Sequence, residues 1–106
     1  MVTKSNKEIQ LNGIRIREIS WIAKLAAKRL HANNAAIVIG KTIHLYNTSR
    51  FDFLQNKKWL KHEMCHVKQF QQYGFIRFIA EYLWESLKKG YHNNKFEVAA
   101  REAEDL

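Results

Sequence analysis

The first half of the chain contains two stretches in which hydrophobic and polar residues alternate, the pattern of half-buried β-strands. In the first stretch, apolar residues flank Asn12-Gly13, a turn pair that accepts positive φ at both positions. In the second, β-branched residues flank Gly40-Lys41, and a glycine at the first turn position fits a type II′ turn. We therefore expect hairpins near residues 8–17 and 36–46, unless only the second arm of the first one is a strand.

Four other segments repeat their apolar residues every three or four positions, which is the spacing of an amphipathic helix. They are residues 18–32, 57–73, 75–89 and 95–104. Residues 50–55 read as an irregular connection whose apolar side chains pack beneath the next helix. The order of these elements predicts an α+β fold, a zincin-like minimal domain in which a small antiparallel sheet packs on about four helices.

Length and composition limit the kind of protein. With 106 residues, 46% of them hydrophobic, the chain is expected to form one domain over residues 1–106, with residues 1–7 as a flexible tail. It has no apolar run long enough to cross a membrane, and its first residues do not resemble a signal peptide. Its one cysteine cannot form an internal disulfide. We therefore expect a cytoplasmic protein with no membrane partner, and its oligomeric state stays open.

The net charge of +8 raises the question of an anionic partner. The basic residues lie mainly before and within the first predicted helix and just before residue 62. They do not alternate with aromatic residues as in a groove that binds single-stranded nucleic acid. A solvated basic surface therefore accounts for the charge better than a nucleic-acid partner does.

The clearest chemical signal is the H-E-x-x-H pattern from His62 to His66, inside the predicted helix 57–73. Because four residues make about one helical turn, His62 and His66 lie on one face, and their imidazoles can bind the same metal ion. Glu63 lies next to that face and can accept a proton from a water in the metal's open position. The pattern therefore predicts a metal site with a base beside it.

A catalytic zinc site needs a third protein ligand besides the two histidines. The remaining histidines, Cys65 and the carboxylates are candidates, but Cys65 points away from the ligand face and is expected to be a buried filler. The helix 75–89 leads away from the motif helix and back beside it, so a short helix after the next turn can cross the site. Glu97, in the first turn of that helix, would then face the histidines. Alternatively, Glu97 is only a favourable charge at a helix N-terminus.

The two histidines and Glu63, followed roughly thirty residues later by Glu97-x-x-Ala100, resemble the gluzincin branch of zinc metallopeptidases. The chain is similar to minigluzincins and to small bacterial zincin-like domains over roughly residues 35–103. In the metzincin class, a glycine and a histidine follow the motif where this chain has Gln69 and Gln72, so that class is excluded. The gluzincin resemblance implies one zinc ion per chain, with Glu63 as the general base. It also implies that the metal ligands are His62, His66 and Glu97.

The resemblance also implies how a peptide or unfolded-protein substrate binds. An edge strand of the sheet would pair with the extended peptide through backbone hydrogen bonds. The residues of this strand would be Ile43, His44, Leu45 and Tyr46. Tyr91 and His92, in the turn before Glu97, are candidates to donate a hydrogen bond to the carbonyl oxygen as it gains negative charge.

One position departs from the gluzincin pattern. Several gluzincins have an aspartate four residues after the ligand glutamate, where this chain has Arg101. An arginine cannot accept a hydrogen bond from a ligand histidine, so another residue must orient the imidazoles. The candidates are Gln69, Glu102 and Glu104, and either glutamate could also replace Glu97 as the third ligand.

The sequence therefore predicts a zinc-dependent metallopeptidase. A catalytically silent module that binds zinc or peptide is the first alternative, although a purely structural metal site has no need of a base such as Glu63. A basic domain associated with nucleic acid is the second alternative, and salt-dependent binding to DNA or RNA would support it.

Overall fold

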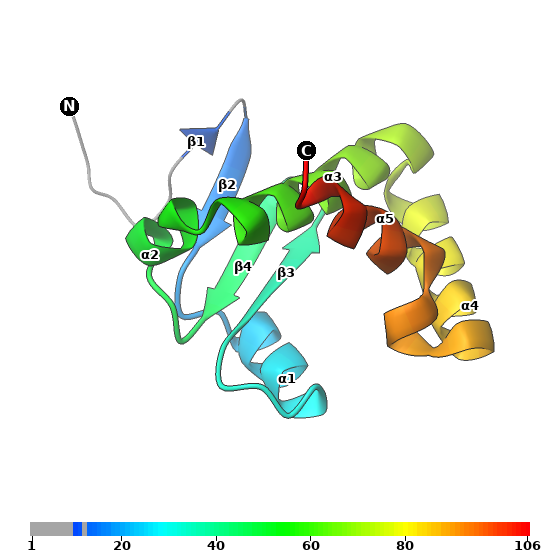
Figure 1. The fold of residues 1–106 in the computed structure, drawn as a ribbon, viewed down its shortest axis with the longest axis horizontal. Helices are drawn as coiled ribbons and strands as arrows, with labels where there is room; N and C mark the ends of the chain where they lie inside the picture. Colours follow the sequence, from blue (N-terminus) through cyan, green and yellow to red (C-terminus); the bar gives the residue numbers. More distant parts are fainter. Residues whose placement is uncertain (1–9, 12) are drawn as a thin grey trace. The chain divides into compact units, whose positions relative to one another are not determined.

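The computed structural model describes residues 10, 11 and 13–106, with side chains from residue 13 onward (Figure 1). The predicted flexible tail at residues 1–7 lies outside these residues. Contacts divide the chain into two compact units, Met1–Asn56 (unit 1) and Lys57–Leu106 (unit 2). A single domain over the whole chain therefore stays a prediction. The described residues form four strands and five helices, which confirms the α+β class.

Unit 1 contains a sheet of four strands, β1 (Gln10–Leu11), β2 (Ile14–Arg17), β3 (Ala35–Ile39) and β4 (Thr42–Tyr46), in the order β1-β2-β4-β3 (Figure 1). The pairs β1–β2 and β3–β4 are antiparallel, as predicted for the two hairpins. β2 and β4 run parallel, so the prediction of a wholly antiparallel sheet is wrong for this pair. Helix α1 (Trp21–Arg29) connects β2 to β3 and packs against β3 and β4, a crossover that allows β4 to lie parallel to β2.

The core of unit 1 follows from the alternation of side chains along the strands. Alternate residues of β2, β3 and β4 point to the same face of the sheet, and the buried apolar residues on it are Ile14, Ile16, Val38, Ile43 and Leu45. Arg15 and Arg17, on the opposite face of β2, are exposed. The alternation of hydrophobic residues in the sequence therefore predicts which residues form strands, but it does not predict the order of the strands in the sheet.

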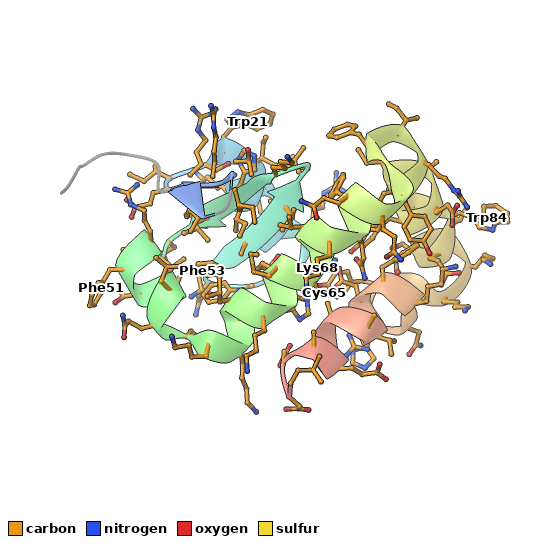
Figure 2. The ribbon with its side chains drawn as sticks, turned by 90° about the horizontal axis from the view of Figure 1, so that it is seen from above. Trp21, Phe51, Phe53, Cys65, Lys68 and Trp84 are labelled. Atoms are coloured by element: carbon orange, nitrogen blue, oxygen red, sulfur yellow. The ribbon has the colours of Figure 1, made fainter. Side chains whose placement is uncertain are left out.

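The segment predicted as an irregular connection is instead the helix α2 (Arg50–Gln55). The side chain of Ser49 caps this helix by accepting a hydrogen bond from the backbone N–H of Asp52 at 3.0 Å. Phe53 is fully buried, whereas Phe51 projects outward (Figure 2). Two residues rotate the direction of a side chain by about 200° around a helix, so Phe51 and Phe53 point to opposite sides of α2.

The predicted edge strand at Ile43, His44, Leu45 and Tyr46 is not at an edge. It belongs to β4, which lies between β2 and β3 and is hydrogen-bonded to both. Ile43 and Leu45 are fully buried. The prediction is wrong because the hairpin β3–β4 adds to the sheet through its second strand, so the backbone groups that a peptide would need are already paired.

His44 makes the stability of unit 1 dependent on pH. Its Nδ1 atom forms a 2.9 Å hydrogen bond with the hydroxyl of Ser20, which caps helix α1. Burial, aided by the nearby Arg17 guanidinium, lowers the pKa of His44 below its ordinary value of 6.5. The folded protein therefore binds this proton less tightly than the unfolded chain, so the contribution of His44 is complete above about pH 6.5 and is lost as the pH falls below it.

We expect the thermal midpoint of the wild type to fall between pH 7 and pH 5 by more than that of a His44→Gln variant. The variant keeps a polar side chain near Ser20 and has no titrating group at this position. Melting curves followed by circular dichroism at both pH values measure the difference. Equal pH dependence in the two proteins would mean that His44 does not titrate differently on unfolding.

Unit 2 consists of three helices, α3 (Lys57–Tyr73), α4 (Phe75–Asn93) and α5 (Lys95–Ala103). Helix α3 has the predicted bounds. The predicted end of α4 at residue 89 corresponds to a kink at Gly90, which has φ +81°, and one more helical turn follows. No helix in the described part of the chain is long and apolar enough to cross a membrane.

Aromatic side chains hold the three helices of unit 2 together. The ring centroid of Phe78 on α4 lies 4.6 Å from that of Phe70 on α3 and 4.9 Å from that of Phe96 on α5. All three rings are buried, and edge-to-face packing of this kind adds to the hydrophobic stabilisation. Figure 1 shows α5 returning alongside α3, and this return brings residue 97 close to the motif histidines.

Candidate metal centre

His62 and His66 project from the same face of α3, as their spacing predicts, and their ring centroids are 5.2 Å apart. Oε1 of Glu97 on α5 lies 3.1 Å from Nε2 of His62 and 3.2 Å from Nε2 of His66. These three residues each offer a ligand atom, and the atoms lie within 4.8 Å of one another, so the group could hold a metal ion. Within the part of the chain that the structure describes, it is the one group of three such residues.

The other nitrogen of each imidazole is bound to an acceptor. Nδ1 of His66 donates to Oε1 of Gln69 at 2.9 Å, and Nδ1 of His62 donates to Oε2 of Glu104 at 2.8 Å. The orientation of the Gln69 amide follows from its Nε2 atom, which donates to the carbonyl oxygen of Phe96 at 3.2 Å. In their neutral form, with hydrogen on both Nδ1 atoms, the imidazoles would direct their Nε2 lone pairs toward Glu97; in their protonated form, both Nε2 atoms donate to Glu97.

This arrangement fits a cation. Three atoms with lone pairs face one another, and they repel unless the histidines are protonated or a metal ion lies between them. The two N–O distances, 3.1 and 3.2 Å, are close to the separation of about 3.3 Å between ligands of a tetrahedral zinc ion with bonds of about 2.0–2.1 Å. Two imidazoles and a carboxylate are also a donor set that zinc commonly takes.

The charges at the centre are strongly coupled. Burial alone would lower the pKa of His62, but its hydrogen bonds to Glu97 and Glu104 outweigh this effect and raise the pKa to about 9. The pKa of His66 is also raised, because the hydrogen bond and charge of Glu97 outweigh burial. Burial would raise the pKa of Glu97, yet the bonds from both histidines hold it well below its ordinary range. The centre therefore has a negative potential that favours a positive charge.

Glu63 lies beside this cluster and is buried. Burial raises the pKa of its carboxyl to about 7, although the positive charges of His66 and His62 and a hydrogen bond from Trp59 act in the opposite direction. An acid of this pKa changes protonation near neutral pH, as a general base must. The structure thus brings together the four residues that the motif and Glu97 predict.

Two tyrosines of α4 reach the same centre. The hydroxyl of Tyr82 donates a hydrogen bond to Oε2 of Glu97. Burial, followed by the negative charge of Glu97, raises the pKa of Tyr91. The same two causes raise the pKa of Tyr82, so both hydroxyls keep their protons at neutral pH. Tyr82 was missed in the sequence because its spacing from Phe78 reads as one more core aromatic, and no motif marks the hydroxyl.

The other predicted residues have different positions. His92 is exposed, and the hydrogen bond that the structure shows for it is made by its backbone carbonyl, which accepts from Arg101. Glu102 is exposed, whereas Glu104, the alternative that the sequence left open, binds His62. Cys65 is half-buried and lines a hollow between α3 and α5. Figure 2 shows it near Lys68 on α3. The expectation of a buried filler at Cys65 is therefore wrong.

Asn94 fixes the corner between α4 and α5 and with it the position of Glu97. Its side-chain oxygen accepts from the backbone N–H of Phe96 at 2.8 Å and caps α5. Its amide nitrogen donates to the carbonyl oxygen of Tyr82 and to the hydroxyl of Ser86. Asn94 is fully buried, so water cannot replace these partners.

We expect Asn94→Ala to lower the free energy of unfolding by about 2–4 kcal/mol, because the helix cap is lost and buried polar groups are left unpaired. Denaturant unfolding followed by circular dichroism measures the change. Asn93→Ala, at the exposed neighbouring position, is the matched control and should cost less than about 0.5 kcal/mol. Similar losses in the two variants would show that the cap does not stabilise this corner.

Comparison with protein-family models, with curated proteins and with solved structures finds no match for this chain.

Proposed function

We propose that the protein is a zinc-dependent metallopeptidase. The observation that carries the proposal is the position of Glu63, a buried carboxyl beside the convergent group His62, His66 and Glu97. A metal site that only stabilises a fold has no need of a carboxyl group beside the ligands that does not itself bind the metal. The gluzincin-like order of these residues in the sequence supports the same function.

The donor set supports a catalytic rather than a structural metal ion. Structural zinc sites are closed by four protein ligands, whereas catalytic sites use three and leave one position for water or substrate. The group contains three ligand residues among those that the structure describes. Bound there, zinc would supply Lewis-acid chemistry, which makes a water more acidic and polarises a carbonyl group.

The protein's own residues would then carry the protons of the reaction. Glu63 accepts a proton from the water whose oxygen forms the new bond to the peptide carbonyl carbon. As the C–N bond breaks, the same carboxyl returns the proton to the departing amine. Tyr91, whose raised pKa keeps its hydroxyl protonated, can donate a hydrogen bond to the carbonyl oxygen as that atom gains negative charge.

A catalytically silent zinc-binding module is the second candidate, and the burial of the ligands favours it. Glu97, His66 and Glu63 are all buried, whereas a peptidase must admit a peptide bond to its base. In this alternative, the metal ion would join α3 to α5 and stabilise unit 2.

Incubation of the zinc-loaded protein with a mixture of unstructured peptides separates the two candidates. Mass spectrometry of the products identifies new peptide ends. We expect cleavage that stops when a chelator removes zinc and returns when zinc is added back. A protein that holds one zinc ion per chain and leaves every peptide intact would support the silent module instead.

A further inference from the structure

The outer face of α4 carries a stripe of exposed apolar side chains. Ile76, Leu83, Trp84 and Leu87 recur at helical spacing, and each is between 59% and 79% exposed. Ala80 lies between them and is exposed as well. Trp84 projects away from the helix (Figure 2). Single exposed apolar residues are ordinary, but a continuous row of this kind marks an interaction surface.

The charged residues beside this stripe differ in exposure according to sign. Arg77, Lys88 and Lys89 are exposed, and the ammonium of Lys88 lies 5.6 Å from the centre of the Trp84 ring. Glu85 is buried, and its carboxylate accepts a hydrogen bond from the backbone N–H of Lys95. The same carboxylate forms 3.5 Å ion pairs with the ammonium groups of both Lys88 and Lys89. Glu81 is only partly exposed and is paired with Arg77. The rim of the apolar stripe therefore has three positive and two negative charges, and its positive side chains are more exposed than its carboxylates.

The exposed cations of the rim distinguish between possible occupants of the stripe. If two copies packed through α4 in parallel, Lys88 would face Lys88 of the second copy. An antiparallel pair would bring Lys88 and Lys89 near Arg77 of the other helix. Both pairings bring exposed cations together, which is unfavourable even though the ion pairs with Glu81 and Glu85 reduce the repulsion. A surface of anionic lipids has the opposite charge and can also take up apolar side chains.

We propose that α4 lies flat on an anionic phospholipid surface, with its apolar stripe in the region between headgroups and acyl chains. Long basic side chains at the rim would reach the headgroups, and a tryptophan is well suited to the interface. The net charge of +8 adds long-range attraction. The expectation of no membrane partner rested on the lack of a spanning segment, and a helix that lies on the surface does not need one.

Sedimentation of the full chain with lipid vesicles tests this proposal. One set of vesicles contains phosphatidylcholine alone, and a second contains about one third phosphatidylserine. We expect the protein to sediment with the second set at least tenfold more strongly and to be released by added salt. The assay measures neither zinc nor peptide cleavage, so its result is independent of the proposed function.

Two exposed tryptophans provide matched variants. Trp84→Gln should weaken binding to the anionic vesicles at least tenfold, whereas Trp21→Gln, which changes an exposed tryptophan of unit 1, should leave it unchanged. Leu87→Gln is a second variant of the stripe, and unchanged circular dichroism confirms that each variant folds. The proposal is overturned if the wild type does not sediment with anionic vesicles, or if the two tryptophan variants lose binding equally. It is also overturned if the wild type forms a dimer that Leu87→Gln dissociates while no vesicle binding is seen.

Discussion

We expect Glu63→Gln to abolish the proposed peptide cleavage while the protein still binds one zinc ion per chain. Glutamine has almost the same shape as glutamate, but its amide cannot accept the proton of the attacking water. Loss of a general base typically lowers the rate by about 10²–10⁴-fold. Because Glu63 is buried and its pKa is raised to about 7, a neutral side chain should be tolerated in its place. Cleavage rates and zinc content, measured on the same preparation, test both parts of the prediction.

Glu102→Gln is the matched control for this experiment. Glu102 is exposed, and it is not among the residues that form the candidate metal group. The control should keep both the zinc ion and the activity of the wild type. If Glu63→Gln cleaved peptides as fast as this control, Glu63 would not be the base, and any activity would have to arise elsewhere.

The second large effect concerns the third ligand. Glu97→Gln should weaken zinc binding by more than 100-fold, because a neutral amide replaces the one carboxylate that meets both Nε2 atoms. Glu104→Gln should weaken it less, by about 10–100-fold, since Glu104 only orients His62. Competition with a chromogenic chelator measures the affinities.

The order of the three glutamate variants is what matters. The structure predicts the greatest loss for Glu97→Gln, a smaller loss for Glu104→Gln and none for Glu102→Gln. The sequence alone leaves these three carboxylates open as ligands, because they lie within eight residues of one another on or beside one short helix. If Glu104→Gln lost more zinc affinity than Glu97→Gln, Glu104 would be the third ligand and Glu97 would not.

Local spacing predicted most of the candidate centre. Positions 62 and 66 are one helical turn apart, so any helix over this segment brings their imidazoles to one face. Glu97 could be predicted to lie near the histidines because a long helix followed by a tight turn leaves the next helix few ways to pack against the motif helix. The choice between Glu102 and Glu104 could not be made, because it depends on the last turn of α5 and on the rotation of that helix against α3.

The sheet shows a different limit. Alternation identified the hairpins, but the same alternation fits any order of strands. The pairing of β2 with β4 depends on how the chain passes from β2 through α1 to β3. The spacing of apolar residues contains no information about this connection. The short helix α2 was also missed, because its six residues are too few to reveal a helical period and only Ser49 marks its start.

The central claim is that His62, His66 and Glu97 hold a divalent ion, and the metal content of the purified protein tests it most directly. Elemental analysis of the wild type should find close to one zinc ion per chain, and a His62→Ala variant purified in parallel should contain none. A wild type that remains free of metal when zinc is supplied, or a His62→Ala variant that holds as much zinc as the wild type, would contradict it.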